Sequence, residues 1–296
     1  MADASAPDGA DLRADTRGVR VGEGRYALEL SDAWDYVLPS GGVIQTCALR
    51  AAADELAAEE LRLCSATAVF CAPLQRGALE LEVVVLRRGV ATAQVRVDVR
   101  NRGAELGAVV TATFASPRRG PDVRGAAMPR TRAVGDALRT DGGEPASPHA
   151  RFRFYRQVEC RIADGERTWL PEFEAGPARY ARWFRYRVAQ RTPGGLLDRL
   201  ALPPLIDTMP TALQRAIGPG DYQFYAPSLD LTLHVVDDTA REWLLLSSYV
   251  RRALDGVAVG EMEVWDDEGR FLAFGTQAMY LKRLTGAPPA VDASRR

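Results

Sequence analysis

Apolar and polar residues alternate along two blocks of this chain, near residues 23–115 and 151–284. The alternation, seen for example at Glu263-Val264, is typical of strands that bury one face. Turn sequences with a final glycine, Asn101-Arg102-Gly103 and Asp267-Glu268-Gly269, follow strands at matching places in the two blocks. The pattern therefore predicts two sets of antiparallel strands.

Each block also contains one stretch that is long and apolar enough for a helix, over residues 43–57 in the first block and about 196–217 in the second. The blocks end in comparable phrases, DVRNRGAELGAVVTATF and EVWDDEGRFLAFGTQAMY, which indicates an internal repeat. The predicted strands cover residues 25–30, 64–70, 78–89, 91–103 and 105–116 in the first block, and 152–162, 181–190, 228–236, 242–256, 258–269 and 270–283 in the second.

One helix followed by a run of antiparallel strands can bury its apolar side only by lying across the sheet. A bent antiparallel sheet wrapped round one helix is the hotdog architecture. The chain is therefore predicted to be an α+β protein with two tandem hotdog modules, 23–115 and 151–284, whose sheets pair edge to edge. Residues 116–150, rich in Pro, Gly, Arg and Asp, are predicted to be a linker, residues 1–22 a disordered N-terminus, and residues 285–296 a frayed tail.

The composition narrows the classes of function. A net charge of −1 creates no overall field that would recruit nucleic acid or an anionic membrane. The stretch ARYARWFRYRV, residues 178–188, is aromatic and basic, but its alternation favours a strand, so no nucleic-acid partner is predicted. No apolar run approaches the roughly 20 residues of a membrane span, and the N-terminus lacks the apolar region of a signal peptide. A soluble cytoplasmic protein with no membrane partner is expected.

The cysteines and histidines give no sign of a metal centre. The four cysteines form no CxxC pair, and neither histidine has the spacing of a metal ligand. Buried free thiols in a reducing compartment, and no metal or cofactor, are therefore predicted. These residues are Cys47, Cys64, Cys71, Cys160, His149 and His234.

Several short phrases, in matching order and spacing, resemble the acyl-CoA thioesterase II family of double-hotdog enzymes. In the first block they are the helix entry at Gly41-Gly42 and the stretch FCAPLQRGALELEVVVLRRG, and in the second block IDTMP, PSLDLTLHVV, EWLLL and GRFLAFGTQAMYLKR. The resemblance covers roughly residues 23–284 outside the linker. It implies hydrolysis of an acyl-CoA substrate to free acid and CoA, within fatty acid metabolism, and it also allows a homo-oligomer.

The resemblance also implies which residues act. In that family an Asp on the central helix of the second module, a Thr or Ser at the start of the next strand, and a Gln on the last strand bind the attacking water. The matching positions in this sequence are Asp207, Ser228 and Gln277. Serine replaces the commoner threonine at position 228, which keeps the hydroxyl group.

These residue types suit thioester hydrolysis, which needs an activated water and a donor for the developing oxyanion. A shielded Asp207 would gain basicity through desolvation, while the neutral Ser228 and Gln277 can each donate and accept hydrogen bonds. Backbone N–H groups at the free end of the hotdog helix are expected to hold the carbonyl oxygen.

Each of the three residues also has a purely structural interpretation. Asp207 stands near an expected helix start, where Asp commonly acts as an N-cap. Ser228 could be an ordinary strand-entry hydroxyl. Gln277 is expected to point inward from a strand, where its amide needs partners that Asp207 and Ser228 would supply.

The first block serves as an internal control. It has no carboxylate between Asp35 and Asp54, and Thr111 stands opposite Gln277 when positions are counted from the matched glycines of the two turns. The first block is therefore predicted to be a structural support and a wall of the acyl and CoA channels. Arginines in the linker and at two matching strand ends could meet CoA phosphates, but surface roles are favoured for Arg87, Arg88, Arg251, Arg252, Arg118, Arg119, Arg124, Arg130 and Arg132.

Three other functions of the hotdog fold can be compared with this sequence. A double-hotdog dehydratase or hydratase needs a catalytic histidine with an acidic partner, yet His149 falls in the linker and His234 at a strand end. A non-catalytic acyl-binding module would keep the fold without turnover, although the joint presence of all three polar groups in the second block argues against it. An acyltransferase differs from a hydrolase only in the nucleophile that enters, so product analysis is needed to separate them.

Overall fold

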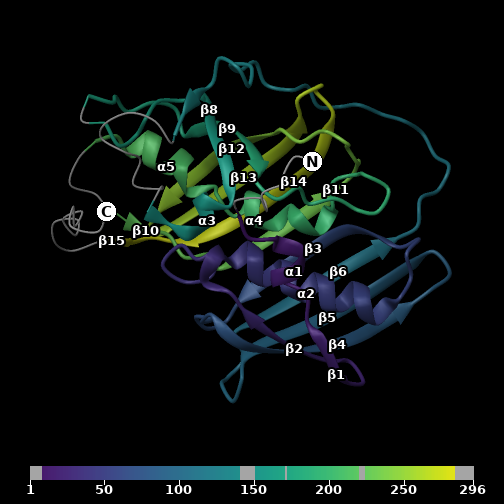
Figure 1. Cartoon of the computed structure of the whole chain (residues 1–296). Helices are drawn as coiled ribbons and strands as arrows, with labels where there is room; N and C mark the ends of the chain where they lie inside the picture. Colours follow the sequence, from purple (N-terminus) through teal and green to yellow (C-terminus); the bar gives the residue numbers. More distant parts are fainter. Residues whose placement is uncertain (1–8, 141–150, 171, 220–223, 284–296) are drawn as a thin grey trace, which may run out of the picture.

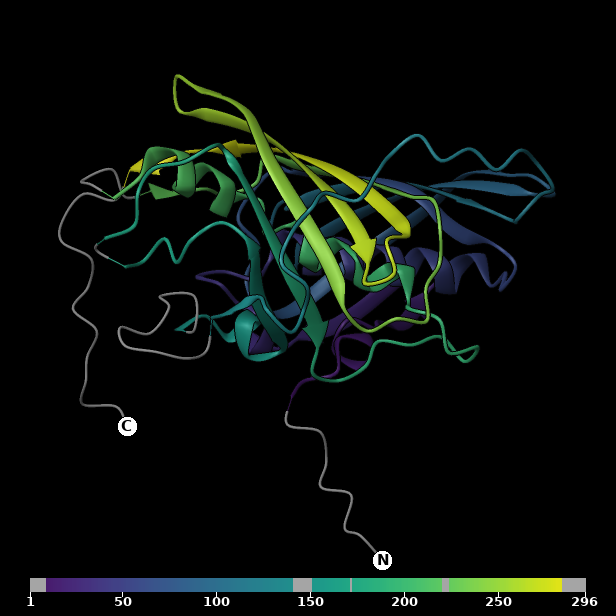
Figure 2. The same cartoon turned by 90° about the horizontal axis from the view of Figure 1, so that it is seen from above.

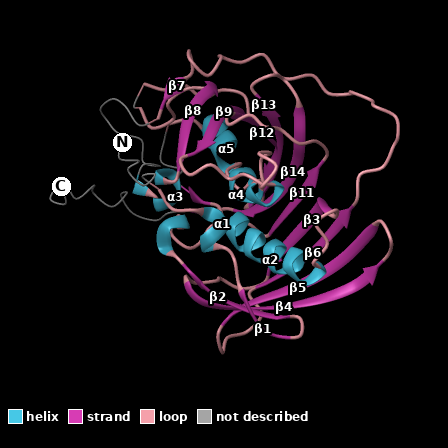
Figure 3. Cartoon of the chain, turned by 45° about the vertical axis from the view of Figure 1, so that its right-hand side comes forward, coloured by secondary structure: helices cyan, strands magenta, loops and turns pink. Residues whose placement is uncertain are grey.

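The computed structural model describes residues 9–140, 151–170, 172–219 and 224–283. Within these residues the strands form one large antiparallel sheet that curves around a few helices, as Figures 1 and 3 show and Figure 2 shows from above. The strands of the first module are β1 (Val19–Gly22), β2 (Arg25–Leu30), β3 (Arg62–Phe70), β4 (Gly77–Arg88), β5 (Thr92–Asn101) and β6 (Ala108–Ala115). The second module contributes β7 (Leu138–Arg139), β8 (Val158–Asp164), β9 (Arg179–Tyr186), β11 (Asp230–Val235), β12 (Leu244–Leu254), β13 (Val257–Asp266) and β14 (Phe271–Tyr280), while β10 (Phe224–Tyr225) pairs separately with β15 (Lys282–Arg283).

The strand order reveals the repeat. The sheet runs β1-β2-β4-β5-β6-β3-β11-β14-β13-β12-β9-β8-β7, so the second module follows the order of the first in reverse. Strands β3 and β11 pair at the centre, where Thr67 lies opposite Thr232 and their hydroxyl oxygens are 3.0 Å apart. The edge-to-edge pairing of two hotdog modules, predicted from the sequence, is confirmed.

One helix in the first module fulfils the role expected of it. Helix α2 (Gly41–Leu56) packs across β4, β5 and β6, and Val43, Cys47 and Leu49 on it are fully buried. The other helical segments are α1 (Leu12–Asp15), η1 (Asp32–Trp34), α3 (Arg153–Arg156), η3 (Arg199–Ala201), α4 (Pro203–Ile206) and α5 (Pro210–Ile217).

The second module has no single long helix among its described residues, in contrast to the prediction for 196–217. Three short pieces, η3, α4 and α5, take its place. Prolines open both α-helical pieces, Pro203 and Pro204 at α4 and Pro210 at α5. A proline fits the first turn of a helix but breaks the hydrogen bonding of its interior. The interruption leaves Asp207 as the C-cap residue of α4.

Part of the N-terminus predicted to be disordered is folded. Residues 9–22 contain α1, in which Leu12 is fully buried, and β1, which pairs with β2. The segment is held by residues distant in sequence, such as Arg50 and Asp198. Its own small polar residues do not reveal these contacts, so it resembles a flexible leader. Residues 1–8 and the predicted tail 285–296 lie outside the described residues.

The predicted linker is also partly structured. Residues 117–127 are exposed, but Ala137 is buried, and β7 pairs with β8. The indole Nε1 of Trp183 donates to the backbone oxygen of Arg132 (2.8 Å), and Met128 and Val134 pack in the same cluster as Trp183. The second half of the linker thus covers the outer face of the second module's sheet.

This cover explains the aromatic and basic stretch at 178–188. Strand β9 is buried on both faces, whereas alternation predicted burial of one. Arg182 is only 4% exposed; its guanidinium donates to the hydroxyl of Tyr155 (3.0 Å) and to the backbone oxygen of Thr208 (2.7 Å). The side chain of Arg185 is paired with Glu159 and Glu242. Both arginines are thus paired within the chain, Arg182 in the interior and Arg185 at the surface.

Candidate active site

Asp207 is positioned by tight packing between α4 and its neighbours. Ile206, just before it, lies against Gly275 of β14, where an added Cβ would stand 2.6 Å from the Ile206 side chain. On the other side, a Cβ on Gly42 would stand 2.3 Å from the backbone oxygen of Pro203. These two glycines let α4 approach both β14 and α2. Asp207 is consequently held at the junction of the modules, 8% exposed.

The structure brings the three predicted site residues into direct contact. The Ser228 hydroxyl donates to Asp207 Oδ1 (3.0 Å), and the Gln277 amide nitrogen donates to the same oxygen (2.6 Å). The Gln277 amide nitrogen also donates to Ser228 Oγ (2.5 Å). Both amide hydrogens of Gln277 are therefore used inside the set, and its Oε1 is buried with no protein partner among the described residues.

The first module supplies the other half of the Asp207 environment, which sequence reasoning missed. The Ser40 hydroxyl donates to Asp207 Oδ2 (2.8 Å), and so does the backbone N–H of Gly42 (3.0 Å). Ser40 is the N-cap residue of α2, but its side chain makes no capping bond to that helix. Asp207 therefore caps α2 from the other module. The only signal in the sequence was the Ser40-Gly41-Gly42 helix entry.

This geometry corrects two expectations. Backbone N–H groups at the end of the helix were expected to hold the thioester carbonyl, and three of them are not available, because the Gly42 N–H bonds to Asp207 and those of Val43 and Ile44 bond to the Ser40 oxygen. Asp207 was also considered as a cap of a helix that it precedes. It does cap a helix, yet that helix is α2, 165 positions away in sequence.

Strand pairing positions Ser228 and Gln277. Ser228 forms an isolated bridge with Met279 at the edge of β14, and Gln277 lies on β14 with its side chain 2% exposed. The carboxylate of Asp230 accepts from the backbone N–H of Ala278 (2.9 Å), which ties the two segments together. Asp230 supports the geometry without contacting Asp207.

Opposing effects set the proton affinity of Asp207. Burial raises its pKa, because the charged form loses its hydration, and this effect outweighs the donors from Gly42, Ser40, Ser228 and Gln277, which lower it. The net pKa lies above the ordinary aspartate value. An aspartate with raised basicity and an ordered set of donors can accept a proton from a bound water.

The charge of Asp207 acts on two tyrosines. Burial raises the pKa of Tyr225, and the charge of Asp207 raises it further. Burial also raises the pKa of Tyr36 strongly, with smaller contributions from Tyr155 and Asp207. The neutral form of both phenols is thus favoured.

The first module lacks an equivalent set, although the counted position was wrong. Thr111 is exposed and points outward, whereas the inward positions of β6 carry apolar side chains. Thr67 and Thr232, which pair at the centre of the sheet, lie opposite Thr111 and Thr276, so the position that matches Gln277 is one residue further on, at Ala112. The inward residues of β6 are Ala108, Val110, Ala112 and Phe114.

The remaining candidates lie away from Asp207. Arg251 pairs with Glu261 on the surface and stacks on Tyr249. Cys47 and Cys160 are buried, but Cys71 is exposed, in contrast to the expectation of buried thiols. Among the described residues, no hydrogen bond or ion pair links the other arginines named for CoA phosphates to Asp207, Ser228 or Gln277. His149 lies outside the described residues. Among the described residues, no helix is long and apolar enough to cross a membrane.

Comparison with known proteins agrees with this architecture. The acyl-CoA thioesterase N-terminal domain matches residues 30–115, and the acyl-CoA thioesterase C-terminal domain matches residues 132–281. No curated protein matches the sequence. A solved hot dog fold protein of unknown function from Alicyclobacillus acidocaldarius is 21% identical, with a TM-score of 0.76 over 93% of this chain and 98% of its own.

Two further solved structures carry thioesterase descriptions. A candidate thioesterase from Novosphingobium aromaticivorans is 26% identical, with a TM-score of 0.74 over 90% of this chain and 98% of its own. The acyl-CoA thioesterase II TesB2 from Mycobacterium marinum is 17% identical, with a TM-score of 0.73 over 94% of this chain and 100% of its own, a likeness of fold.

The paired sheets and the two matched domains define a double-hotdog thioester hydrolase. The chain belongs to the acyl-CoA thioesterase family.

Proposed function

We propose that this protein hydrolyses acyl-CoA thioesters with Asp207 as the general base and Ser228 and Gln277 as the groups that hold the attacking water. The observation that supports this best is the hydrogen-bonded set of carboxylate, hydroxyl and amide, buried where the two modules meet. Its residue types match the requirements of water activation, and a purely structural role would not require a buried carboxylate with raised basicity.

In the proposed reaction, the oxygen of a water attacks the thioester carbonyl carbon while Asp207 takes one of the water's protons. The buried Gln277 Oε1, whose amide nitrogen is already committed, accepts the other hydrogen of that water and so orients it. The carbon–sulfur bond then breaks, and the CoA thiolate leaves and takes up the proton that Asp207 received. The products are a carboxylic acid and CoA, and Asp207 is regenerated.

The N-terminus of α2 contributes to this step through Asp207. Its partial positive charge and the Gly42 N–H favour the carboxylate form and so oppose the effect of burial on the pKa of Asp207. The first module is therefore proposed to take part in catalysis by tuning the base, beyond acting as a wall of the substrate channel.

The decisive experiment is Asp207→Asn in a thiol-release assay across a series of acyl chain lengths. Asparagine keeps the size of the side chain but cannot accept the proton, so kcat should fall by roughly 10²–10⁴ fold. Binding of acyl-CoA, measured by calorimetry, should persist. A variant that releases CoA at the wild-type rate would show that Asp207 is not the base.

The same assay separates hydrolysis from acyl transfer. If the products without any acceptor are free acid and CoA in equal amounts, water is the nucleophile. CoA release that requires an added alcohol or amine would instead identify a transferase, which uses the same thioester chemistry with another nucleophile.

A further inference from the structure

One face of α2 runs along the segment that ends in Asp207. Gly42, Thr46 and Arg50 are spaced by four residues, so they lie above one another on the helix. Gly42 donates its N–H to Asp207, and the Thr46 hydroxyl donates to the backbone oxygen of Leu200 (2.9 Å). The guanidinium of Arg50 donates to Asp198 Oδ2 (3.0 Å). The helix therefore contacts both ends and the middle of the segment 198–207.

The segment itself is hydrogen bonded throughout. Asp198 is the N-cap residue of η3, where its Oδ1 accepts from the N–H of Leu200 (3.0 Å). The N–H groups of Leu205 and Ile206 bond to the backbone oxygen of Leu202, and the N–H of Asp207 bonds to that of Pro203 (3.0 Å). These bonds form a continuous path from Asp198 through η3 and α4 to Asp207.

The ion pair between Arg50 and Asp198 is buried, with side chains 8% and 9% exposed. Burial alone would raise the pKa of Asp198, but the charge of Arg50, the Leu200 N–H and the charge of Arg13 lower it overall. The ionised form of Asp198 is therefore favoured relative to that of an ordinary aspartate. Removing both charges from water costs free energy, so a buried ion pair by itself is weak evidence for a gain in stability.

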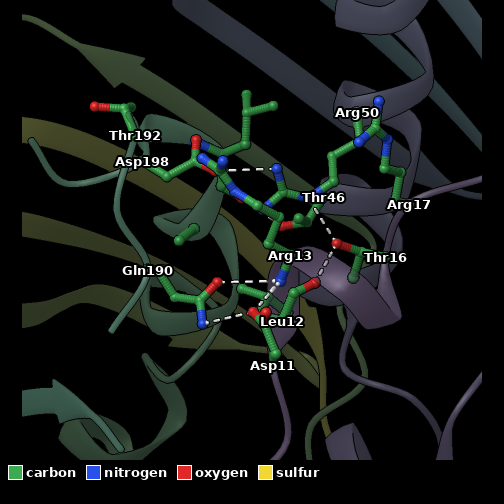
Figure 4. Close-up of polar contacts among 12 residues, drawn as sticks. Asp11, Leu12, Arg13, Thr16, Arg17, Thr46, Arg50, Gln190, Thr192 and Asp198 are labelled. Atoms are coloured by element: carbon green, nitrogen blue, oxygen red, sulfur yellow. Dashed lines mark hydrogen bonds and ion pairs between the residues drawn. The ribbon is translucent and has the colours of Figure 1, made fainter. Parts of the chain in front are cut away.

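The N-terminal segment, residues 10–16, closes over the pair (Figure 4). Arg13 contributes a second guanidinium to Asp198 Oδ2 (3.0 Å), and its backbone N–H bonds to the side chain of Gln190 (3.0 Å). The Thr16 hydroxyl accepts from Arg50 Nε (2.7 Å) and donates to the backbone oxygen of Leu12. This segment, here called the N-terminal clasp, joins α2 of the first module to the Asp198 loop of the second.

We propose that Arg50 and Asp198 are positioning residues that set the distance between α2 and Asp207, and that the N-terminal clasp locks this pair in place. The inference rests on the proposed role of Asp207 as the base. It gives the N-terminal clasp, residues 10–16, a function in turnover, in which it holds the two modules in the register that keeps the Gly42 N–H on the carboxylate.

The principal test is Asp198→Asn, measured by steady-state thiol release below the unfolding temperature. Asparagine can still cap η3, but it loses the charge that holds Arg50 and Arg13. We expect kcat to fall by about 10- to 100-fold, because a misplaced reacting group is costly even when the shift is small, with KM changed by less than about threefold. Losing part of the Gly42 bond should also raise the pKa of Asp207 and move the acid limb of the kcat profile to higher pH.

A merely structural ion pair would lower the melting temperature and leave both kcat and the acid limb unchanged. The matched control is Asp267→Asn, which breaks the surface pair with Arg241 (2.6 and 2.9 Å) and should leave kcat at the wild-type value. An unchanged kcat and acid limb in a folded Asp198→Asn protein would overturn the proposal.

A milder pair of variants covers the case in which Asp198→Asn does not fold. The Arg13 side chain is 39% exposed, so Arg13→Ala should fold, lower kcat about threefold to tenfold and shift the acid limb in the same direction, whereas Arg13→Lys should restore both. If Arg13→Ala retains the wild-type kcat and acid limb, the clasp has no part in positioning.

Asp207→Asn, assayed in parallel, separates the two proposals. Wild-type activity of Asp207→Asn refutes the general-base assignment. An inactive Asp207→Asn together with an unaffected Asp198→Asn refutes only the positioning role.

Discussion

At the scale of single residues, Asp207 is a carboxylate in an unusual balance. It is buried, which favours the protonated form, yet four donors favour the ionised form. The donors come from both modules, two from α2 and its cap residue and two from the second module. The basicity of the proposed base is thereby tied to how the modules pack.

This balance predicts the pH dependence of turnover. Only ionised Asp207 can accept a proton, so kcat should fall as the pH drops through its raised pKa, at a higher pH than an exposed aspartate would give. Ser228→Ala removes one donor that lowers this pKa, so its acid limb should lie higher still. Ser228→Thr keeps the hydroxyl and should match the wild type. The check is kcat against pH for all three proteins; an acid limb for Ser228→Ala at or below that of the wild type would contradict the assignment.

The sequence predicted the second-module residues of this site through resemblance and missed those of the first module. Asp207, Ser228 and Gln277 lie within phrases whose order can be compared. Ser40 and Gly42 contact Asp207 across 165 to 167 positions, and no spacing rule encodes such a contact. Misplacing Thr111 had a different cause, since the two blocks are offset by one residue when counted from their turns, and an offset of one reverses which side of a strand faces inward.

At the scale of elements, the close approach of α2 and α4 is the critical contact. Helix α2 was predictable from its long apolar pattern. The interruption of 196–217 could also have been read from Pro203, Pro204 and Pro210, which fit only first turns. What the sequence could not show is that the resulting short α4 lies directly on the Gly42 end of α2.

Gly42→Ala tests that contact. The added methyl group would stand 2.3 Å from the Pro203 oxygen and 2.6 Å from Pro204 Cα, so the helices must separate. We expect a loss of about 1–3 kcal/mol in unfolding free energy from overpacking, and a fall in kcat of about 10²-fold as Asp207 moves from its donor. Gly135→Ala, where an added Cβ meets no atom within 4 Å, is the control and should change neither quantity. Wild-type kcat in Gly42→Ala would mean that the spacing of the two helices does not matter to turnover.

At the scale of the whole molecule, the two modules share one core. A single cluster of buried side chains includes Leu49 and Leu79 from the first module and Phe184, Leu205 and Leu231 from the second. The sheet is also continuous through β3 and β11. Two predicted domains joined by a linker suggest independent folding. The sequence alone does not show the apolar surface that one module buries against the other. The modules are therefore expected to unfold together.

Calorimetry distinguishes the two cases. A shared core predicts one heat-absorption peak whose calorimetric and van't Hoff enthalpies agree, with thiol-release activity lost over the same temperature range. Leu79→Ala, in the core of the first module, should lower the free energy of unfolding of the whole molecule by about 2–5 kcal/mol and shift the single peak to lower temperature. Leu86, on the same strand, is 58% exposed, so Leu86→Ala should shift the peak little. Two peaks, with only one displaced by Leu79→Ala, would show that the modules are independent.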